Sequence, residues 1–304
     1  MTVTVLVPSE DGQTALTRLD WAEPVRYQPG EPWPEQAMSA EVLVVPAPCP
    51  DPGQLLAAMR ELPKLRMVQT LSAGTELWEG KLPDGVLLSN ARGANGGATA
   101  ELAMAGLLAM YRQVLQFGAD QAAHRWNQHQ TETMAGKRLL ILGAGDLGQH
   151  LRAMAEPFGV TVTLVGRSAR AGVRGFDELP DLIGGQDVVV VMVPSNAETR
   201  HLVDAAFLAR MPDRSVLVNV ARGPVVDTDA LLAELTSGRL RAVLDVTDPE
   251  PLPAGHPLWD APGVIILPHV GGATDGTLER SWGVAAEQIT AFVAGGEPPN
   301  LVPA

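Results

Sequence analysis

The sequence has little cysteine and no excess of positive charge. Cys49 is its single cysteine, which excludes an internal disulfide framework and fits a reducing compartment. The 22 Lys and Arg against 35 Asp and Glu give a net charge of −13, whose field repels the phosphates of nucleic acids. No basic segment precedes an apolar one in the first residues, so a secretory signal is not predicted.

Long hydrophobic runs are lacking as well. A membrane-spanning helix needs about 20 apolar residues, and the most apolar helical stretch, 102–111, is much shorter. Hydrophobic residues still make up 46% of the chain and charged residues 19%, which is typical of a globular protein. We therefore expect a cytoplasmic protein that binds neither membranes nor nucleic acid, and 304 residues are enough for two domains.

Short β-branched runs alternate with helical patterns, which predicts an α/β fold of parallel sheets with crossover helices. Strands are expected at 3–7, 42–45, 67–71 and 86–88, and in a second series at 139–142, 160–165, 188–193, 215–220, 242–246 and 264–267. Helices are expected at 51–62, 98–116, 146–158, 227–237 and 276–294, and an irregular loop at 21–34. The second series is apolar on both faces, as in a parallel sheet covered by helices on both sides.

A glycine-rich motif begins this second series. Residues Gly143-Ala144-Gly145-Asp146-Leu147-Gly148 fit G-x-G-x-x-G between an expected strand and an expected helix. In that context backbone N–H groups and a helix N-terminus hold a pyrophosphate. Gly143 would permit the tight turn, Gly145 the approach of the pyrophosphate and Gly148 the contact between helix and strand. An ordinary glycine-rich turn is the alternative.

The end of the next strand indicates which dinucleotide is bound. NAD sites usually place Asp or Glu there to bond the ribose 2′-OH, but this strand runs into Gly166-Arg167-Ser168-Ala169-Arg170. Gly166 brings no repulsion toward a 2′-phosphate, and Ser168 can donate a hydrogen bond to it. Arg167 and Arg170 can pair with it. These residues favour NADP(H), and solvated arginines beside NAD(H) are the alternative.

Three charged or titratable side chains come shortly after apolar strands. Arg222, Glu250 and His269 each follow a different strand of the second series. Ligands of open α/β sheets bind beyond the carboxyl ends of the strands, so all three are expected at one cleft beside the cofactor. A structural ion pair and a histidine in a turn are the alternative interpretation.

The residues around these side chains resemble the D-isomer-specific 2-hydroxyacid dehydrogenase family. The similar segments are Val218-Asn219-Val220-Ala221-Arg222-Gly223-Pro224-Val225-Val226-Asp227, Leu244-Asp245-Val246, Pro249-Glu250-Pro251-Leu252 and Pro268-His269-Val270-Gly271-Gly272-Ala273-Thr274, with Glu198-Thr199-Arg200-His201-Leu202 and the glycine motif upstream. The resemblance is strong over 99–274. It is weaker before that, where Ser72-Ala73-Gly74 and Asn90-Ala91-Arg92-Gly93 match loosely.

The resemblance implies two domains and an activity. A Rossmann-type dinucleotide-binding domain would span 94–274, and a smaller flavodoxin-like substrate domain would consist of 1–93 and 275–304. The expected reaction is hydride transfer between NADP(H), or NAD(H), and a small 2-oxo or 2-hydroxy acid such as glyoxylate or hydroxypyruvate. The expected assembly is a homodimer.

The resemblance also implies a role for each catalytic residue, and the chemistry of the side chains agrees with it. His269 would be the general acid–base that exchanges a proton with the substrate oxygen. Glu250 would stabilise the imidazolium. Arg222 would bind the substrate carboxylate and polarise the carbonyl, because its planar fork matches both oxygens.

Further residues complete the expected site. Backbone N–H groups of Ala73 and Gly74 would receive the substrate carboxylate, and Asp245 would bond the nicotinamide carboxamide. The whole set expected at the cofactor is Gly143, Gly145, Asp146, Leu147, Gly148, Gly166, Arg167, Ser168, Arg170, Val193, Pro194, Thr199, Val220, Ala221, Arg222, Asp245, His269, Gly271 and Gly272. No group of His, Cys and carboxylates has metal-ligand spacing, so no metal is expected.

Two alternatives stay open. The family includes transcriptional corepressors, so the chain could be a nucleotide-sensing binding protein on the same fold. A phosphoglycerate-type dehydrogenase would need cationic residues near Ser72–Gly74, where only Lys64, Arg66 and Arg92 are close in sequence.

Overall fold

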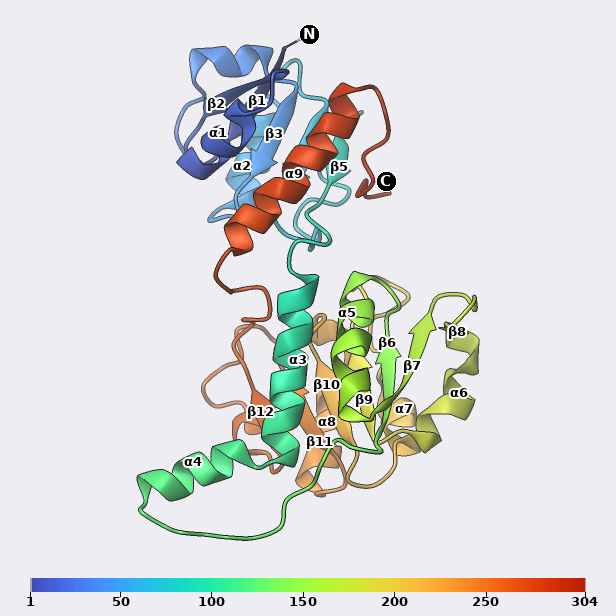
Figure 1. The fold of residues 1–304 in the computed structure, drawn as a ribbon. Helices are drawn as coiled ribbons and strands as arrows, with labels where there is room; N and C mark the ends of the chain where they lie inside the picture. Colours follow the sequence, from blue (N-terminus) through green and yellow to red (C-terminus); the bar gives the residue numbers. More distant parts are fainter. Residues whose placement is uncertain (1, 304) are drawn as a thin grey trace. The chain divides into compact units, whose positions relative to one another are not determined.

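The computed structural model describes residues 2–303, and these form two compact units (Figure 1). The first unit contains the residues up to Asn95 together with those from Asp275 onward, and the second is Gly96–Thr274. These divisions lie within two residues of the predicted domain bounds. Among the described residues, no helix is both long and apolar enough to cross a membrane.

The first unit is built on a five-stranded parallel sheet. Its strands are β1 (Val3–Val7), β2 (Ala22–Arg26), β3 (Val42–Val45), β4 (Met67–Thr70) and β5 (Leu87–Ser89), in the order β2-β1-β3-β4-β5. This is the strand order of flavodoxin-like sheets. One difference from the sequence prediction is β2, because part of the expected loop 21–34 pairs with β1 as an edge strand. An edge strand tolerates Pro24, since one side of the strand needs no hydrogen-bond partner.

Helices cover both faces of this sheet. Helix α9 (Thr277–Val293) lies across one face (Figure 1). Its residues Trp282, Ile289 and Phe292 belong to the same hydrophobic core cluster as the valines of β1. Helix α1 (Glu10–Thr17) packs beside α9, and α2 (Pro52–Met59) covers the other face. Helix α9 therefore completes the core of the first unit, although it is far from β1 in the sequence.

The second unit is built on a seven-stranded parallel sheet. Its strands are β6 (Arg138–Leu142), β7 (Thr161–Gly166), β8 (Arg174–Gly175), β9 (Val188–Val191), β10 (Val216–Asn219), β11 (Arg241–Leu244) and β12 (Val264–Ile266). The order β12-β11-β10-β9-β6-β7-β8 is the doubly wound order of Rossmann folds with one added edge strand, and it reverses between β6 and β9. The predicted Rossmann-type α/β fold is therefore confirmed.

Two helical layers enclose this second sheet. Helices α3 (Gly96–Tyr111) and α5 (Asp146–Ala155) pack side by side on one face (Figure 1). Helices α6 (Leu179–Leu182), α7 (Ala205–Arg210) and α8 (Thr228–Thr236) contribute to the core on the other. The helix expected at 98–116 is wrong in its extent: α3 ends at Tyr111, and α4 (Val114–Ala122) follows after Gln113, whose φ of 51° interrupts the helix.

Candidate active site

Two buried polar residues end neighbouring strands of the second unit. Asn219 ends β10 and Asp245 follows β11, and their side chains belong to residues only 1% and 3% exposed. The Asp245 N–H donates to Asn219 O at 2.9 Å, which continues the pairing of the two strands. The side chains of Asn219 and Asp245 each stabilise a turn that contains a predicted catalytic residue.

The turn of His269 is organised by Asp245. The carboxylate accepts the N–H of Val270 at 2.8 Å and that of Gly271 at 3.0 Å, while the His269 N–H donates to Asp245 O at 2.8 Å. His269 has a φ of 53°, a left-handed conformation that non-glycine residues adopt seldom. The Asp245 interactions maintain that conformation, which projects the exposed imidazole beyond the sheet.

Glu250 lies against this imidazole. Its Oε1 is 2.5 Å from His269 Nδ1, and the two side chains are 39% and 47% exposed. The contact engages Nδ1, so Nε2 is the ring nitrogen left to exchange a proton with a ligand. The structure thus brings together two of the three predicted catalytic residues.

Arg222 sits on a turn held by Asn219. The Asn219 Oδ1 accepts the Ala221 N–H at 3.1 Å, and Nδ2 donates to Arg222 O at 2.9 Å. The next residue, Gly223, is so close to the chain after β11 that a Cβ there would be 1.9 Å from Thr247 O. The Arg222 turn therefore abuts the segment that leads to Glu250.

The glycine-rich loop lies at the same edge of the sheet, between β6 and α5. A Cβ at Gly143 would be 2.5 Å from Met192 O, and one at Gly148 would be 2.0 Å from Gly143 O, so both positions need glycine. Gly145 is exposed, and a Cβ there would meet no atom within 4 Å. The loop thus leaves open space where α5 begins with no side-chain cap, which fits a pyrophosphate.

Two arginines follow β7, and they have different hydrogen-bond partners. Residues 167–170 are all exposed, and Gly166 is buried beneath the Arg170 guanidinium, whose Nη1 would be 2.9 Å from a Cβ at position 166. Arg170 Nη2 donates to Ala144 O of the glycine loop at 3.3 Å. Arg167 instead pairs with Glu198, which the sequence interpretation did not foresee.

The other expected cofactor residues lie in the segments that follow β9, β10 and β12. Val193, Val220 and Ala221 are buried, and Gly271 is buried beside the half-buried Gly272. Thr199 is 5% exposed, and its hydroxyl donates to Pro194 O at 2.6 Å. Its hydroxyl therefore shapes the loop after β9.

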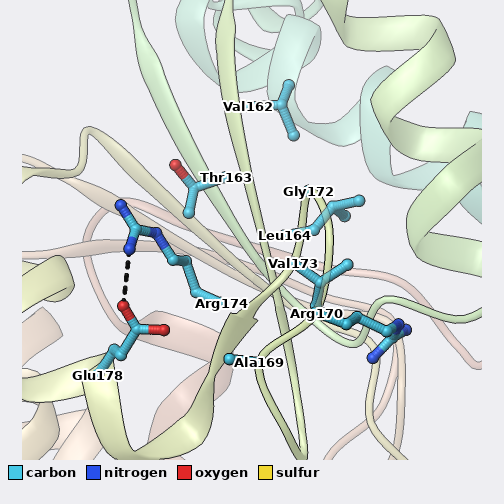
Figure 2. Close-up of a pocket in the computed structure, with 9 residues that line it drawn as sticks. All are labelled: Val162, Thr163, Leu164, Ala169, Arg170, Gly172, Val173, Arg174 and Glu178. Carbon is cyan, nitrogen blue, oxygen red and sulfur yellow. Dashed lines mark hydrogen bonds and ion pairs between the residues drawn. The ribbon is translucent and has the colours of Figure 1, made fainter.

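A separate hollow of about 570 Å³ lies along the outer edge of β7. Figure 2 shows its lining, in which Arg174 pairs with Glu178 at 2.8 Å while the Arg170 side chain points away from them. Only Arg170 belongs to the expected cofactor set, and the β7 side chains here come from the middle of the strand. The strand ends, and not this hollow, carry the candidate site.

In the first unit, the loop after β4 presents the backbone groups expected to bind a carboxylate. The carbonyls of Ser72, Ala73 and Gly74 accept hydrogen bonds from Thr70 Oγ1, Asn90 Nδ2 and Ser72 Oγ. Within the described residues, the N–H groups of Ala73 and Gly74 donate to no protein acceptor. The carbonyl groups of this loop thus already accept hydrogen bonds, and its N–H groups can donate to a ligand.

Known proteins are similar to this chain in both sequence and structure. Residues 104–271 match the family model described as "D-isomer specific 2-hydroxyacid dehydrogenase, NAD binding domain". The chain belongs to this family. It is therefore an enzyme, an oxidoreductase of the 2-hydroxyacid dehydrogenase type, and its dinucleotide-binding domain is of the NAD(P) kind.

Individual relatives cover most of the chain. The glyoxylate reductase of Aeropyrum pernix is 32% identical over 261 residues, which are 80% of this chain and 78% of the relative. A solved family member from Aeromonas salmonicida superposes with a TM-score of 0.86 at 28% identity, covering 100% of this chain and 99% of that one. Another, from Xanthobacter autotrophicus Py2 in complex with NADPH and MES, has a TM-score of 0.83 at 29% identity and covers 99% and 98%.

Proposed function

We propose that this dehydrogenase reduces small 2-oxo acids, glyoxylate or hydroxypyruvate among them, preferentially with NADP(H). The observation that carries the proposal is the His269–Glu250 contact at the sheet edge that also bears the glycine-rich loop. The glyoxylate reductase names of relatives support the substrate class. When bound, the reduced nicotinamide would supply the hydride for carbon 2 of the acid.

The residues of the chain supply the proton and the orientation. His269 holds a proton on Nε2 and donates it to the carbonyl oxygen as charge develops there. Glu250, on Nδ1, keeps the ring oriented and stabilises its cationic form. The Arg222 guanidinium binds the substrate carboxylate and polarises the carbonyl. In the first unit, the N–H groups of Ala73 and Gly74, which donate to no acceptor among the described residues, are the backbone donors that we propose for a carboxylate.

The cofactor preference rests on the end of β7. Gly166 offers no carboxylate to a ribose 2′-OH, and the exposed residues Arg167, Ser168 and Arg170 that follow it can bind a 2′-phosphate. A family member solved with NADPH supports this choice. Gly166→Asp combined with Arg167→Ala should reverse the preference, because the new carboxylate would repel the phosphate and accept from the 2′-OH.

The first experiment is a steady-state panel of 2-oxo acids with each reduced nucleotide. We expect the highest kcat/KM with two- and three-carbon acids, and a higher kcat/KM with NADPH than with NADH. A wild-type preference for NADH would contradict the cofactor proposal, and turnover of none of these acids would contradict the substrate proposal.

Phosphorylated acids are disfavoured because two of the three cations near Ser72–Gly74 in sequence, Arg66 and Arg92, are already engaged. Arg66 pairs with Glu41 at 2.8 Å, and Arg92 donates to Asn300 Oδ1 at 3.0 Å. Both guanidiniums already have partners in the first unit. The substrate panel should therefore show no gain from a phosphate group.

The assembly that we propose is a homodimer through α4 and the segment after it. Val114, Leu115 and Trp126 there are 53%, 59% and 94% exposed. Large apolar side chains that are so exposed within one segment, 114–126, mark a surface that a partner covers. A two-fold dimer of identical chains is the commonest assembly.

A further inference from the structure

The loop that follows β9 brings a carboxylate onto one of the two arginines at the end of β7. Arg167 Nη2 donates to Glu198 Oε2 at 2.7 Å. We infer that Glu198 is a cofactor-specificity residue, which competes with the 2′-phosphate of NADP(H) for Arg167 and so limits the preference for that cofactor. The inference rests on the proposed cofactor site and adds a residue that opposes phosphate binding there.

The backbone of Glu198 is held in place by its own loop. Asn196 Oδ1 accepts the N–H of Glu198 at 2.9 Å and that of Thr199 at 3.1 Å. Thr199 in turn donates its hydroxyl to Pro194 O at 2.6 Å. These bonds fix the main chain, so the carboxylate reaches Arg167 from an anchored position and only the side chain needs to turn away.

The second arginine is held differently. Arg170 donates to a neutral carbonyl, Ala144 O, at 3.3 Å, and in the described part of the chain it pairs with no carboxylate. A dianionic 2′-phosphate would therefore meet one arginine whose charge is already compensated and one whose charge is not. The Glu198 carboxylate would also repel the phosphate directly.

The exposure of the pair limits the size of the effect. The Arg167 and Glu198 side chains are 76% and 70% exposed, and ion pairs of that kind contribute little because water and salt screen them. We therefore expect Glu198 to weaken NADPH binding by about 3- to 10-fold and not to abolish it. NADH, which has no 2′-phosphate, should be affected by less than about twofold.

The test measures binding and does not require turnover. NADPH and NADH are titrated separately into the full-length protein and followed by nucleotide fluorescence, and the ratio of the NADH Kd to the NADPH Kd is compared between variants. Glu198→Gln should raise this ratio by about 3- to 10-fold, mainly through tighter NADPH binding. The rise should shrink as ionic strength increases.

Two further variants control for net charge and for the partner. Glu156→Gln removes the same charge from a comparably short exposed pair, Arg152–Glu156 at 2.6 Å, at the far end of α5 from the glycine loop, and should leave the ratio unchanged. In an Arg167→Ala background, Glu198→Gln should lose the part of its effect that comes from competition for Arg167 and keep only the part that comes from direct repulsion of the phosphate.

The outcomes separate this inference from the proposed cofactor preference. An unchanged ratio in Glu198→Gln, or an equal rise in Glu156→Gln, overturns the inference whichever nucleotide the wild type prefers. A wild type that favours NADH contradicts the proposed preference alone. If the ratio still rises in Glu198→Gln, Glu198 opposes phosphate binding in that case too.

Discussion

The two ring nitrogens of His269 have different surroundings, and the proposed proton transfer depends on that difference. Nδ1 contacts Glu250 at 2.5 Å, while the exposed ring leaves Nε2 for the substrate. His269→Ala should therefore lower kcat for reduction by roughly 10²–10⁴, the usual value of a positioned proton donor. NADPH affinity, measured by fluorescence titration, should change little. Turnover near that of the wild type would remove His269 from the mechanism.

Glu250 should keep the His269 ring in the orientation that leaves Nε2 for the substrate. Its carboxylate contacts Nδ1 at 2.5 Å, and a neutral amide would hold the ring less firmly than a charged partner does. Glu250→Gln should therefore lower kcat for reduction, while NADPH affinity in a fluorescence titration changes little. A kcat equal to that of the wild type would contradict a role for the carboxylate.

Among the elements, the turn after β12 depends on a buried carboxylate. Asp245 accepts two backbone N–H groups, and an amide at that position would present its NH₂ group to one of those donors. Asp245→Asn should destabilise the second unit by about 1–3 kcal/mol and also lower kcat, because the His269 turn would shift. Thermal unfolding and steady-state rates measure the two effects. A loss of stability with unchanged kcat would show that the turn tolerates the change.

Arg239 connects helices α7 and α8 of the second unit. Its guanidinium donates to Glu234 Oε2 at 2.6 Å and to the carbonyls of Leu208 and Met211 at 2.6 and 2.7 Å. Arg239→Ala leaves these acceptors without their donor and should cost about 1–3 kcal/mol in chemical unfolding at neutral pH. Arg239→Lys, which keeps the charge but not the fork, should recover only part of that.

The same pair predicts an acid-dependent loss of stability. The hydrogen bond from Arg239 lowers the pKa of the Glu234 carboxyl below its usual value. A lowered pKa contributes stability above the unfolded-state value of about 4.3, and that contribution is lost as pH falls through the lowered pKa. The difference in unfolding free energy between the wild type and Glu234→Gln should therefore be largest near neutral pH and vanish in strong acid. A difference independent of pH would contradict this.

For the whole molecule, the exposed apolar side chains of α4 and the segment after it predict a homodimer. Light scattering at micromolar concentration should give twice the 32.1 kDa of one chain. Trp126→Glu together with Leu115→Glu should yield monomers, because charges would be buried at the interface. Met38→Glu, at a side chain 43% exposed in the first unit, is the control and should leave the mass unchanged. A monomeric wild type would contradict the dimer.

The sequence by itself determined the fold class, the strands and which side chains follow the strands. The ten predicted strands all occur, with ends shifted by at most two residues, because buried parallel strands are continuous apolar runs that local pattern reveals. The glycine motif and the family resemblance likewise depend on local residues. Segments with weaker patterns were missed: β2 carries a proline and is stabilised by pairing with β1, and a left-handed Gln113 separates α3 from α4.

Only the tertiary structure decided which side chains meet. Glu250 and His269 are 19 residues apart, and Arg167 and Glu198 are 31 apart, so neither contact is visible in a local pattern. The double role of Asp245 was also hidden, because its partners are backbone N–H groups, which every sequence contains. Spacing along a chain predicts local conformation, whereas contacts between strand ends depend on the strand order and register that place those ends at one edge of the sheet.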